Sequence, residues 1–305
     1  MQTPIAIQQT DKLIVSIGEL LWDVLPEGKR PGGAPANLVY HAANNGVRAV
    51  AVTAVGDDPL GREIVERLQN NGVTTIAQIN GYPTGTVDVT VDKGIPAYRI
   101  NTDVAWDHIQ LTDEIISLVA SADAVCYGST ACRQPGTSRD TIYALLNKTR
   151  DDAMRFLDIN LREGYDDAAV LGHLIDSATV LKLNKDELDV LRHLFDITVS
   201  DSDDKEMALL EALEHRFDLR GIVFTDGDSH STVIYDGEVS RIATLHVPVV
   251  DTVGAGDAFS GVFIADILRG KTVGEAHRDA VNLAAYSCTQ AGAWPKYATK
   301  TKTTG

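Results

Sequence analysis

Short runs rich in Val and Ile alternate along the chain with segments of helical periodicity, and this alternation restricts the fold more than any other feature. Six such runs lie at residues 12–18, 49–56, 122–128, 154–160, 178–184 and 221–227. Most are nearly continuously apolar, as strands are when helices cover both faces of a parallel sheet. The pattern therefore predicts an α/β fold, with a mostly parallel sheet and helices on both of its faces.

Glycine and proline mark the ends of two expected helices. Residues 34–46 read as a helix that ends before Gly46, and residues 59–72 begin with Pro59 and end with Gly72. Proline is favoured in the first turn of a helix, and glycine is favoured directly after its last residue.

Two stretches do not follow the alternation of strands and helices. Residues 84–101 alternate apolar and polar side chains around a turn at Lys93-Gly94, which is typical of a half-exposed hairpin. The other stretch, "ELLWDVLPEGKRPGG", reads as an irregular, extended excursion after the first strand. We expect residues of about 19–33 and 82–102 to form a small β lid within one domain that spans 1–305.

Charge and composition exclude several classes of partner. The chain of 305 residues has 43 acidic and 27 basic side chains and a net charge of −16. Nucleic acids and anionic membranes are bound by clustered Lys and Arg, so we expect neither as a partner. No apolar run approaches the ~18 residues of a membrane span, and the N-terminus lacks the pattern of a secretion signal. The three cysteines, which form no CxxC or Cys/His cluster, indicate free thiols and a cytoplasmic protein.

The stretch "DTVGAGDAF" precedes a helical pattern and predicts an anion-binding turn. Gly254 and Gly256 would let backbone N–H groups converge, and the helix start adds a positive dipole. Phe259 stands where a dinucleotide motif needs its third glycine, which argues against a nicotinamide oxidoreductase. Taken alone, Asp257 could be a catalytic acid-base residue or only a cap of the helix.

Two further stretches place polar residues near expected strand ends. Gly32 and Gly33 precede a helix whose first turn presents Asn37, which can donate to and accept from hydroxyl groups. Asn184 and Glu187 are spaced as N-x-x-E, which fits a capping box as well as a metal-supporting pair. Each stretch, taken singly, also has a purely structural interpretation.

Together and in this order, the motifs resemble those of the PfkB (ribokinase-like) carbohydrate kinases. "GGAPANLVYHAANNG" is similar to the N-terminal signature of that family, and "DTVGAGDAFSGVF" is similar to its C-terminal signature. The resemblance covers the chain from "IVSIGELLWDVLP" to "SCTQAGAWP". It implies a Rossmann-like (ribokinase-like) domain with a β-sheet lid over the sugar. It also implies transfer of a phosphoryl group from ATP to a hydroxymethyl group, with Mg²⁺ and often with K⁺.

The resemblance implies roles for residues of the second signature and of one earlier loop. Asp257 matches the catalytic base of the family. The anion hole is matched by Gly254, Ala255 and Gly256. Arg162 matches an arginine near the phosphates or the sugar.

The resemblance also assigns the binding of the sugar and of a monovalent cation. Asp23, Gly33 and Asn37 match sugar-binding positions, and Gly32 stands beside them. Asp251 begins the second signature and matches a position near the K⁺ loop.

Nucleotide and magnesium positions are matched in the second half of the chain. Asn184 and Glu187 match the motif that supports metal and phosphate, with Glu187 acting on Mg²⁺ through water. Thr225, Gly227 and Asn282 match the nucleotide-binding region. The segment "FTDGDSHS" departs from the usual T-L-G pattern, so its individual contacts with ATP stay open.

The resemblance and the chemistry of the motifs lead to one mechanism. Phosphoryl transfer needs an aligned oxygen and charge neutralisation. At a positive helix end, Asp257 is expected to stay ionised, hence to be a weak base that mainly aims the hydroxyl group.

"GGAPAN" and "AWP" are most similar to the fructokinase branch, which favours fructose as the substrate. Ribose, a 2-keto-3-deoxy sugar acid or a nucleoside stay open as substrates. A catalytically silent sugar- or nucleotide-binding protein on the same fold is the alternative to an enzyme. The lid could also form a homodimer interface through its exposed β face.

Overall fold

The computed structural model describes residues 10–26, 28–92, 95–162, 164–199 and 202–297. Its centre is a nine-stranded sheet. From one edge to the other, the strands are β13 (Glu238–Ala243), β12 (His230–Tyr235), β11 (Gly221–Asp226), β10 (Val180–Asn184), β9 (Met154–Asp158), β8 (Ala124–Gly128), β1 (Leu13–Ile17), β4 (Arg48–Gly56) and β5 (Thr74–Asn80).

The sheet is parallel from β11 to β5, and β12 and β13 are antiparallel at one edge. The six predicted strands are confirmed as β1, β4, β8, β9, β10 and β11, and β11 and β12 form a hairpin. The sequence analysis missed β5, because its residues are mostly half-buried at the sheet edge and form no apolar run. Neighbours β4 and β8 flank β1, so the order of the chain reverses there, and open α/β sheets place ligands at such a point.

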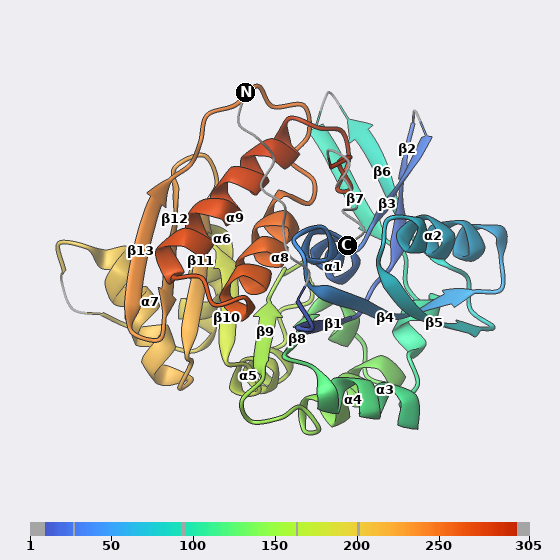
Figure 1. The fold of residues 1–305 in the computed structure, drawn as a ribbon, viewed down its shortest axis with the longest axis horizontal. Helices are drawn as coiled ribbons and strands as arrows, with labels where there is room; N and C mark the ends of the chain where they lie inside the picture. Colours follow the sequence, from blue (N-terminus) through green and yellow to red (C-terminus); the bar gives the residue numbers. More distant parts are fainter. Residues whose placement is uncertain (1–9, 27, 93–94, 163, 200–201, 298–305) are drawn as a thin grey trace, which may run out of the picture.

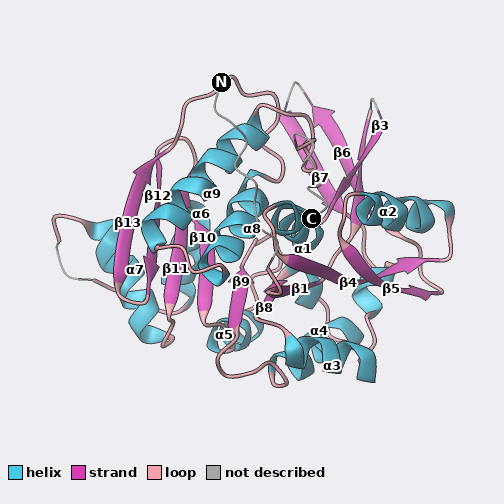
Figure 2. Ribbon diagram, viewed as in Figure 1, coloured by secondary structure: helices cyan, strands magenta, loops and turns pink. Residues whose placement is uncertain are grey.

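Helices cover both faces of the sheet, as predicted (Figures 1 and 2). They are α1 (Ala34–Asn44), α2 (Pro59–Asn70), α3 (Asp113–Ser121), α4 (Thr137–Leu146), α5 (Ala168–Asp176), α6 (Lys185–Leu194), α7 (Lys205–Arg216), α8 (Ala255–Leu268) and α9 (Val273–Cys288), with short 3₁₀ turns at Ala105–His108 and Thr130–Cys132. Two hydrophobic cores result, one on each face. In β1, Val15 and Ile17 belong to the core under α3 to α7, whereas Ile14 belongs to the core under α1, α2, α8 and α9.

A separate four-stranded sheet stands beside the main sheet (Figure 2). Its order is β3 (Gly28–Gly32), β2 (Leu21–Leu25), β6 (Gly85–Asp92) and β7 (Ile95–Ile100). Both pairs β2–β3 and β6–β7 are antiparallel, and β2 pairs with β6 in parallel. The excursion expected at 19–33 is thus a regular hairpin, and the predicted Lys93-Gly94 turn lies outside the described residues. Among the described helices, none is long and apolar enough to cross a membrane.

Helix α8 is buried at the centre of one core, and it approaches α1 closely at Gly261. A Cβ atom at Gly261 would overlap the carbonyl oxygen of Leu38 and lie 2.9 Å from the Cβ atom of His41. The absence of a side chain at Gly261 therefore sets the distance between the helices that carry the two signature motifs.

We predict that Gly261→Ala lowers the free energy of unfolding by about 1–3 kcal/mol, because the two helices must separate. Gly274→Ala is the matched control, since a Cβ atom at this residue of α9 would have no neighbour within 4 Å. Alanine there should leave stability unchanged or raise it by up to about 1 kcal/mol. Urea unfolding followed by circular dichroism distinguishes the two. Equal stabilities of the two variants would contradict the close-packing argument.

Candidate active site

The turn before α8 has the geometry of an anion-binding site. Gly254 has φ 77° and is the N-cap of α8, and a Cβ atom there would lie 2.9 Å from the Cα atom of Ala293. Helix α8 begins at Ala255, so the first N–H groups of the helix have no partner within the helix. The N–H of Ala255 donates to the carbonyl oxygen of Thr252, which leaves the N–H groups of Gly256 and Asp257 for a ligand. The alternative role of Asp257 as a cap is wrong, because the cap is Gly254 and no side chain caps the helix.

The Asp257 carboxylate instead joins the two signature motifs. Its Oδ2 atom accepts a hydrogen bond of 2.7 Å from Nδ2 of Asn37, which lies in the first turn of α1. The Oδ1 atom of Asn37 in turn accepts a bond of 2.8 Å from the indole N–H of Trp294. The indole thus fixes the orientation of the amide, and the amide N–H points at the carboxylate.

Burial changes the acidity of Asp257. Removal from water and the nearby carboxylate of Asp158 raise its pKa to about 6, against the opposing effects of Asn37, Lys182 and Arg162. At pH 7 the group is still mostly ionised, as predicted. It is nevertheless a stronger base than the helix dipole alone suggested, because desolvation outweighs the positive end of α8.

A buried ion pair, which the sequence analysis missed, lies beneath the turn. Lys182 of β10 and Asp158 of β9 are partners in the strand register, and their side chains meet at 2.7 Å. A Cβ atom at Gly256 would lie 3.2 Å from the Nζ atom of Lys182, so the ammonium group lies directly beside the turn. The burial of Lys182 opposes its charge, but Asp158 and Glu187 raise its pKa. The sequence feature that could have identified this pair is a charged residue within each of two apolar strands, because charged residues are rarely buried without a partner.

Asn184 and Glu187 form the capping box that their spacing predicted. Asn184 is the N-cap of α6 and its side chain accepts from the N–H of Glu187, while Glu187 accepts from the N–H of Asn184 at 2.8 Å. The other carboxylate oxygen of Glu187 accepts from the N–H of Leu161, also at 2.8 Å. Burial and the charge of Asp158 raise the pKa of Glu187. The capping role is confirmed, and the metal role stays a prediction.

The lid contributes Asp23, next to the two predicted glycines. A Cβ atom at Gly32 would lie 2.7 Å from Oδ2 of Asp23, and one at Gly33 would lie 2.9 Å from the carbonyl carbon of Glu19. Gly33 has φ 108°, a conformation that side chains disfavour. Burial raises the pKa of Asp23 to about 6, while the charge of Arg162 opposes this rise.

Glu19, which the sequence analysis did not select, is a second buried carboxyl group at this place. It follows Gly18 at the end of β1 and is only 4% exposed, and its Oε2 atom has no hydrogen-bond partner among the described residues. Burial raises its pKa to about 7, against the charge of Arg162, and the charge of Asp257 adds to the rise. The sequence feature that could have identified Glu19 is an acidic residue directly after the glycine that follows a buried strand.

Arg162 is exposed, and its charge lowers the pKa of the buried Glu19 and of the half-buried Asp23 and Asp257. Lid and main domain are joined by a different arginine. Arg30 of β3 contacts Oδ2 of Asp251 at 2.7 Å. The same carboxylate accepts from the N–H groups of Gly292 and Val253. The positive charge beside Asp251 is therefore supplied by the lid.

A cleft of about 380 Å³ opens beside the turn, on the side of β11 and β12. Its lining includes Thr225, Gly227, Ala255 and Gly256, so two predicted nucleotide residues share a cavity with two residues of the predicted anion hole. Predicted Asn282 is exposed on α9 and is not among the lining residues.

A ribokinase-like sheet with a β lid, an anion-binding turn at a helix start and a buried aspartate beside it define a kinase of small hydroxylated molecules. The comparisons agree with this class. Residues 10–299 match the pfkB family carbohydrate kinase, and the chain belongs to that family.

Three relatives show the range of the family around this chain. An uncharacterized sugar kinase of Pyrococcus horikoshii is 30% identical over 304 residues, which cover 92% of each chain. Its crystal structure in complex with ATP has a TM-score of 0.78, with 92% of this chain and 94% of that chain covered. An ATP-dependent 6-phosphofructokinase of Thermoanaerobacterium thermosaccharolyticum is 26% identical, covering 92% of this chain and 89% of its own. Fructokinase-2 of Solanum lycopersicum is 27% identical, covering 90% and 88%.

We predict that Glu19→Gln changes the pH dependence of stability. The folded state holds the Glu19 proton more tightly than the unfolded state, so this stabilising contribution is full below about pH 4.5 and is lost as pH rises through about 7. Glutamine does not ionise. The variant should therefore gain about 3 kcal/mol in free energy of unfolding relative to the wild type between pH 5 and pH 8.5.

Urea unfolding at the two pH values measures this gain. Glu66→Gln on the exposed face of α2 is the control for the change in net charge. A difference between Glu19→Gln and the wild type that is the same at both pH values would refute the burial effect.

Proposed function

We propose that this carbohydrate kinase transfers the terminal phosphoryl group of ATP to a hydroxymethyl group of a small neutral sugar, with fructose as the first choice. The observation that carries the proposal is the hydrogen bond of 2.7 Å between Asn37 and Asp257, residues 220 positions apart. It brings the predicted sugar-binding motif into contact with the predicted base. ATP enters the proposal through the resemblance and through the ATP complex of the relative from P. horikoshii.

Asp257 would accept the proton of the sugar hydroxyl. Its pKa of about 6 leaves it mostly ionised at pH 7, and this value is close to the optimum for a general base at neutral pH. The bond from Asn37 occupies Oδ2, which leaves Oδ1 for the hydroxyl group. The carboxylate would thereby aim the oxygen as well as accept its proton.

The turn and Lys182 would stabilise charge on the transferred group. The N–H groups at the start of α8 and the ammonium group beside Gly256 are positive and held in place by the fold, and preorganised donors of this kind lower transition-state energies strongly. Arg162, which is exposed and whose charge acts on the three carboxyl groups, would contact phosphate or sugar.

The donor set fits Mg²⁺, which when bound would neutralise phosphate charge. The carboxylate of Glu187 is buried and oriented by two backbone N–H groups, and each oxygen keeps a lone pair for a water ligand. A K⁺ ion does not fit the carboxylate of Asp251 equally well, because Arg30 already compensates its charge. The proposed mechanism therefore omits K⁺.

The electrostatics of the lid side favour a neutral substrate. Three carboxyl groups lie close enough to Arg162 for its charge to lower their pKa values, namely those of Glu19, Asp23 and Asp257. Lys29 and Arg30, the cations nearest to Asp23 in the lid sequence, are paired with Glu63 and Asp251. A sugar phosphate or a sugar acid would meet this negative field, whereas hydroxyl groups can bond to carboxylates. Fructokinase-2 is a relative that fits this preference.

We predict that a substrate panel with ATP and Mg²⁺ gives the highest kcat/KM for fructose, by at least about tenfold over ribose, a nucleoside, a 2-keto-3-deoxy sugar acid and fructose 6-phosphate. Coupled detection of ADP provides the measurement. A higher value for either anionic substrate would refute the electrostatic argument. A higher value for ribose or the nucleoside would overturn the choice of fructose but would still support a neutral substrate. No turnover with any substrate would favour the silent binding protein.

We predict that Asp257→Asn lowers kcat by about 10²–10⁴-fold, because the amide cannot accept the proton. Binding of the sugar and of ATP should change little, since asparagine keeps the shape of the side chain. Titration calorimetry measures binding, and Asp176→Asn on the exposed end of α5 is the control. If turnover of Asp257→Asn stayed within tenfold of the control, Asp257 would not be the base.

A further inference from the structure

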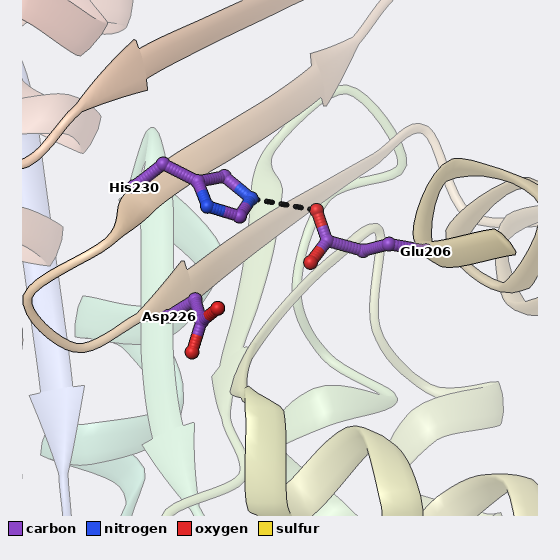
Figure 3. Close-up of side chains that lie close together, drawn as sticks. All are labelled: Glu206, Asp226 and His230. Carbon is purple, nitrogen blue, oxygen red and sulfur yellow. Dashed lines mark hydrogen bonds and ion pairs between the residues drawn. The ribbon is translucent and has the colours of Figure 1, made fainter. Parts of the chain in front are cut away.

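A cluster of three potential metal ligands lies beside the cleft, outside the machinery described above (Figure 3). Asp226 ends β11 and His230 begins β12, and the two residues are partners in the register of the hairpin. Glu206 projects from the first turn of α7. Two carboxylate oxygens and one imidazole nitrogen thereby lie within 4.8 Å of one another. Asp226 and His230 belong to the segment "FTDGDSHS", which departs from the T-L-G pattern.

The imidazole of His230 has two contacts that conflict. Its Nε2 atom lies 2.7 Å from Oε1 of Glu206 and 2.9 Å from Nη2 of Arg241. A carboxylate requires an N–H at that atom, whereas a guanidinium requires a lone pair, and one nitrogen cannot offer both. A metal ion in place of the guanidinium removes the conflict, because it binds the lone pair of Nε2 and the carboxylate together. The other ring nitrogen, Nδ1, lies 2.9 Å from Oγ of Ser229 and can donate to it, which would orient the ring.

The charges of the cluster suit replacement of two side chains by one divalent ion. Lys185 contacts Asp226 at 3.0 Å, and Arg241 contacts Glu206 at 3.1 Å. The Lys185 and Arg241 side chains are 61% and 42% exposed, whereas those of the three ligands are 12–21% exposed. Both cations can therefore swing into solvent, and Arg241 keeps its contact of 2.8 Å with Asp204. A divalent ion supplies the two positive charges that leave.

We propose that Glu206, Asp226 and His230 bind a divalent ion of the zinc class, with water as the fourth ligand. Imidazole with carboxylate oxygens is a donor set that zinc accepts, whereas Mg²⁺ and Ca²⁺ prefer oxygen alone. Tetrahedral ligands at about 2.1 Å from zinc lie about 3.4 Å apart, so small side-chain rotations close the site. His230 and Gly227 line the cleft, and the ion would fix the turn between β11 and β12 that forms one wall. This site does not depend on the proposed substrate.

The test measures Zn²⁺ binding to the full chain after chelator treatment and without nucleotide, by titration calorimetry, with Co²⁺ absorption as a second probe. We expect His230→Ala and Glu206→Gln each to weaken binding by at least about hundredfold, because even changes outside the ligand shell cost about ten- to hundredfold. His246→Ala, an exposed histidine that lines the same cleft, should bind as the wild type does.

Arg241→Ala separates a metal site from an ordinary ion-pair cluster. Removal of the competing guanidinium should tighten Zn²⁺ binding if the metal takes its place, and should weaken it or leave it unchanged if Arg241 only completes a salt-bridge network. The proposal is overturned if the wild type binds no Zn²⁺, if His230→Ala and His246→Ala bind equally, or if Arg241→Ala does not bind more tightly. None of these outcomes bears on turnover by Asp257, which is measured separately.

Discussion

The buried pair of Lys182 and Asp158 is the interaction on which the rest of the site depends. It places a positive charge inside a parallel sheet and directly beside the glycine turn. A buried ion pair adds little net stability, because desolvation offsets its attraction, whereas loss of one partner leaves an uncompensated charge. Stability alone therefore does not account for its place between two apolar strands. The pair also adjusts the acidity of Asp257, because burial raises the pKa of that carboxyl group, Asp158 raises it further and Lys182 lowers it.

Around this pair the site divides into two regions of opposite charge. On the cleft side lie the start of α8, the glycine turn and Lys182, which together suit phosphate. On the lid side lie Glu19, Asp23 and Asp257, whose pKa values burial raises to about 7, 6 and 6. Because burial raises their pKa values to about 6 or 7, these carboxyl groups take up and release protons close to neutral pH. The net charge of this region therefore changes within the physiological range. Such a division favours an anionic donor on one side and a neutral acceptor on the other.

Contacts between distant segments join the lid to the main domain and the two signature motifs to each other. Arg30 reaches Asp251 across the site, and Asn37 reaches Asp257 and Trp294. Apart from Arg30 in β3, these residues lie in loops or at helix starts, where backbone groups are available for ligands. The segment between β11 and β12 differs in kind, because Glu206, Asp226 and His230 form a cluster of their own at the edge of the cleft.

The sequence by itself determined the layered α/β fold, the lid segments and the residues of both signatures, because apolar periodicity and glycine turns are local signals. It also determined the capping box of Asn184 and Glu187. Strand β5 was not predicted, because an edge strand does not need a continuous apolar run. Only the tertiary structure excluded the capping role of Asp257 and showed its contact with Asn37, because the cap is Gly254 and Asn37 lies 220 residues away. The roles inferred for Glu19, Lys182 and Asp158 likewise depend on their burial and on their neighbours in the fold. A local sequence pattern does not establish which side chains are buried or which ones meet.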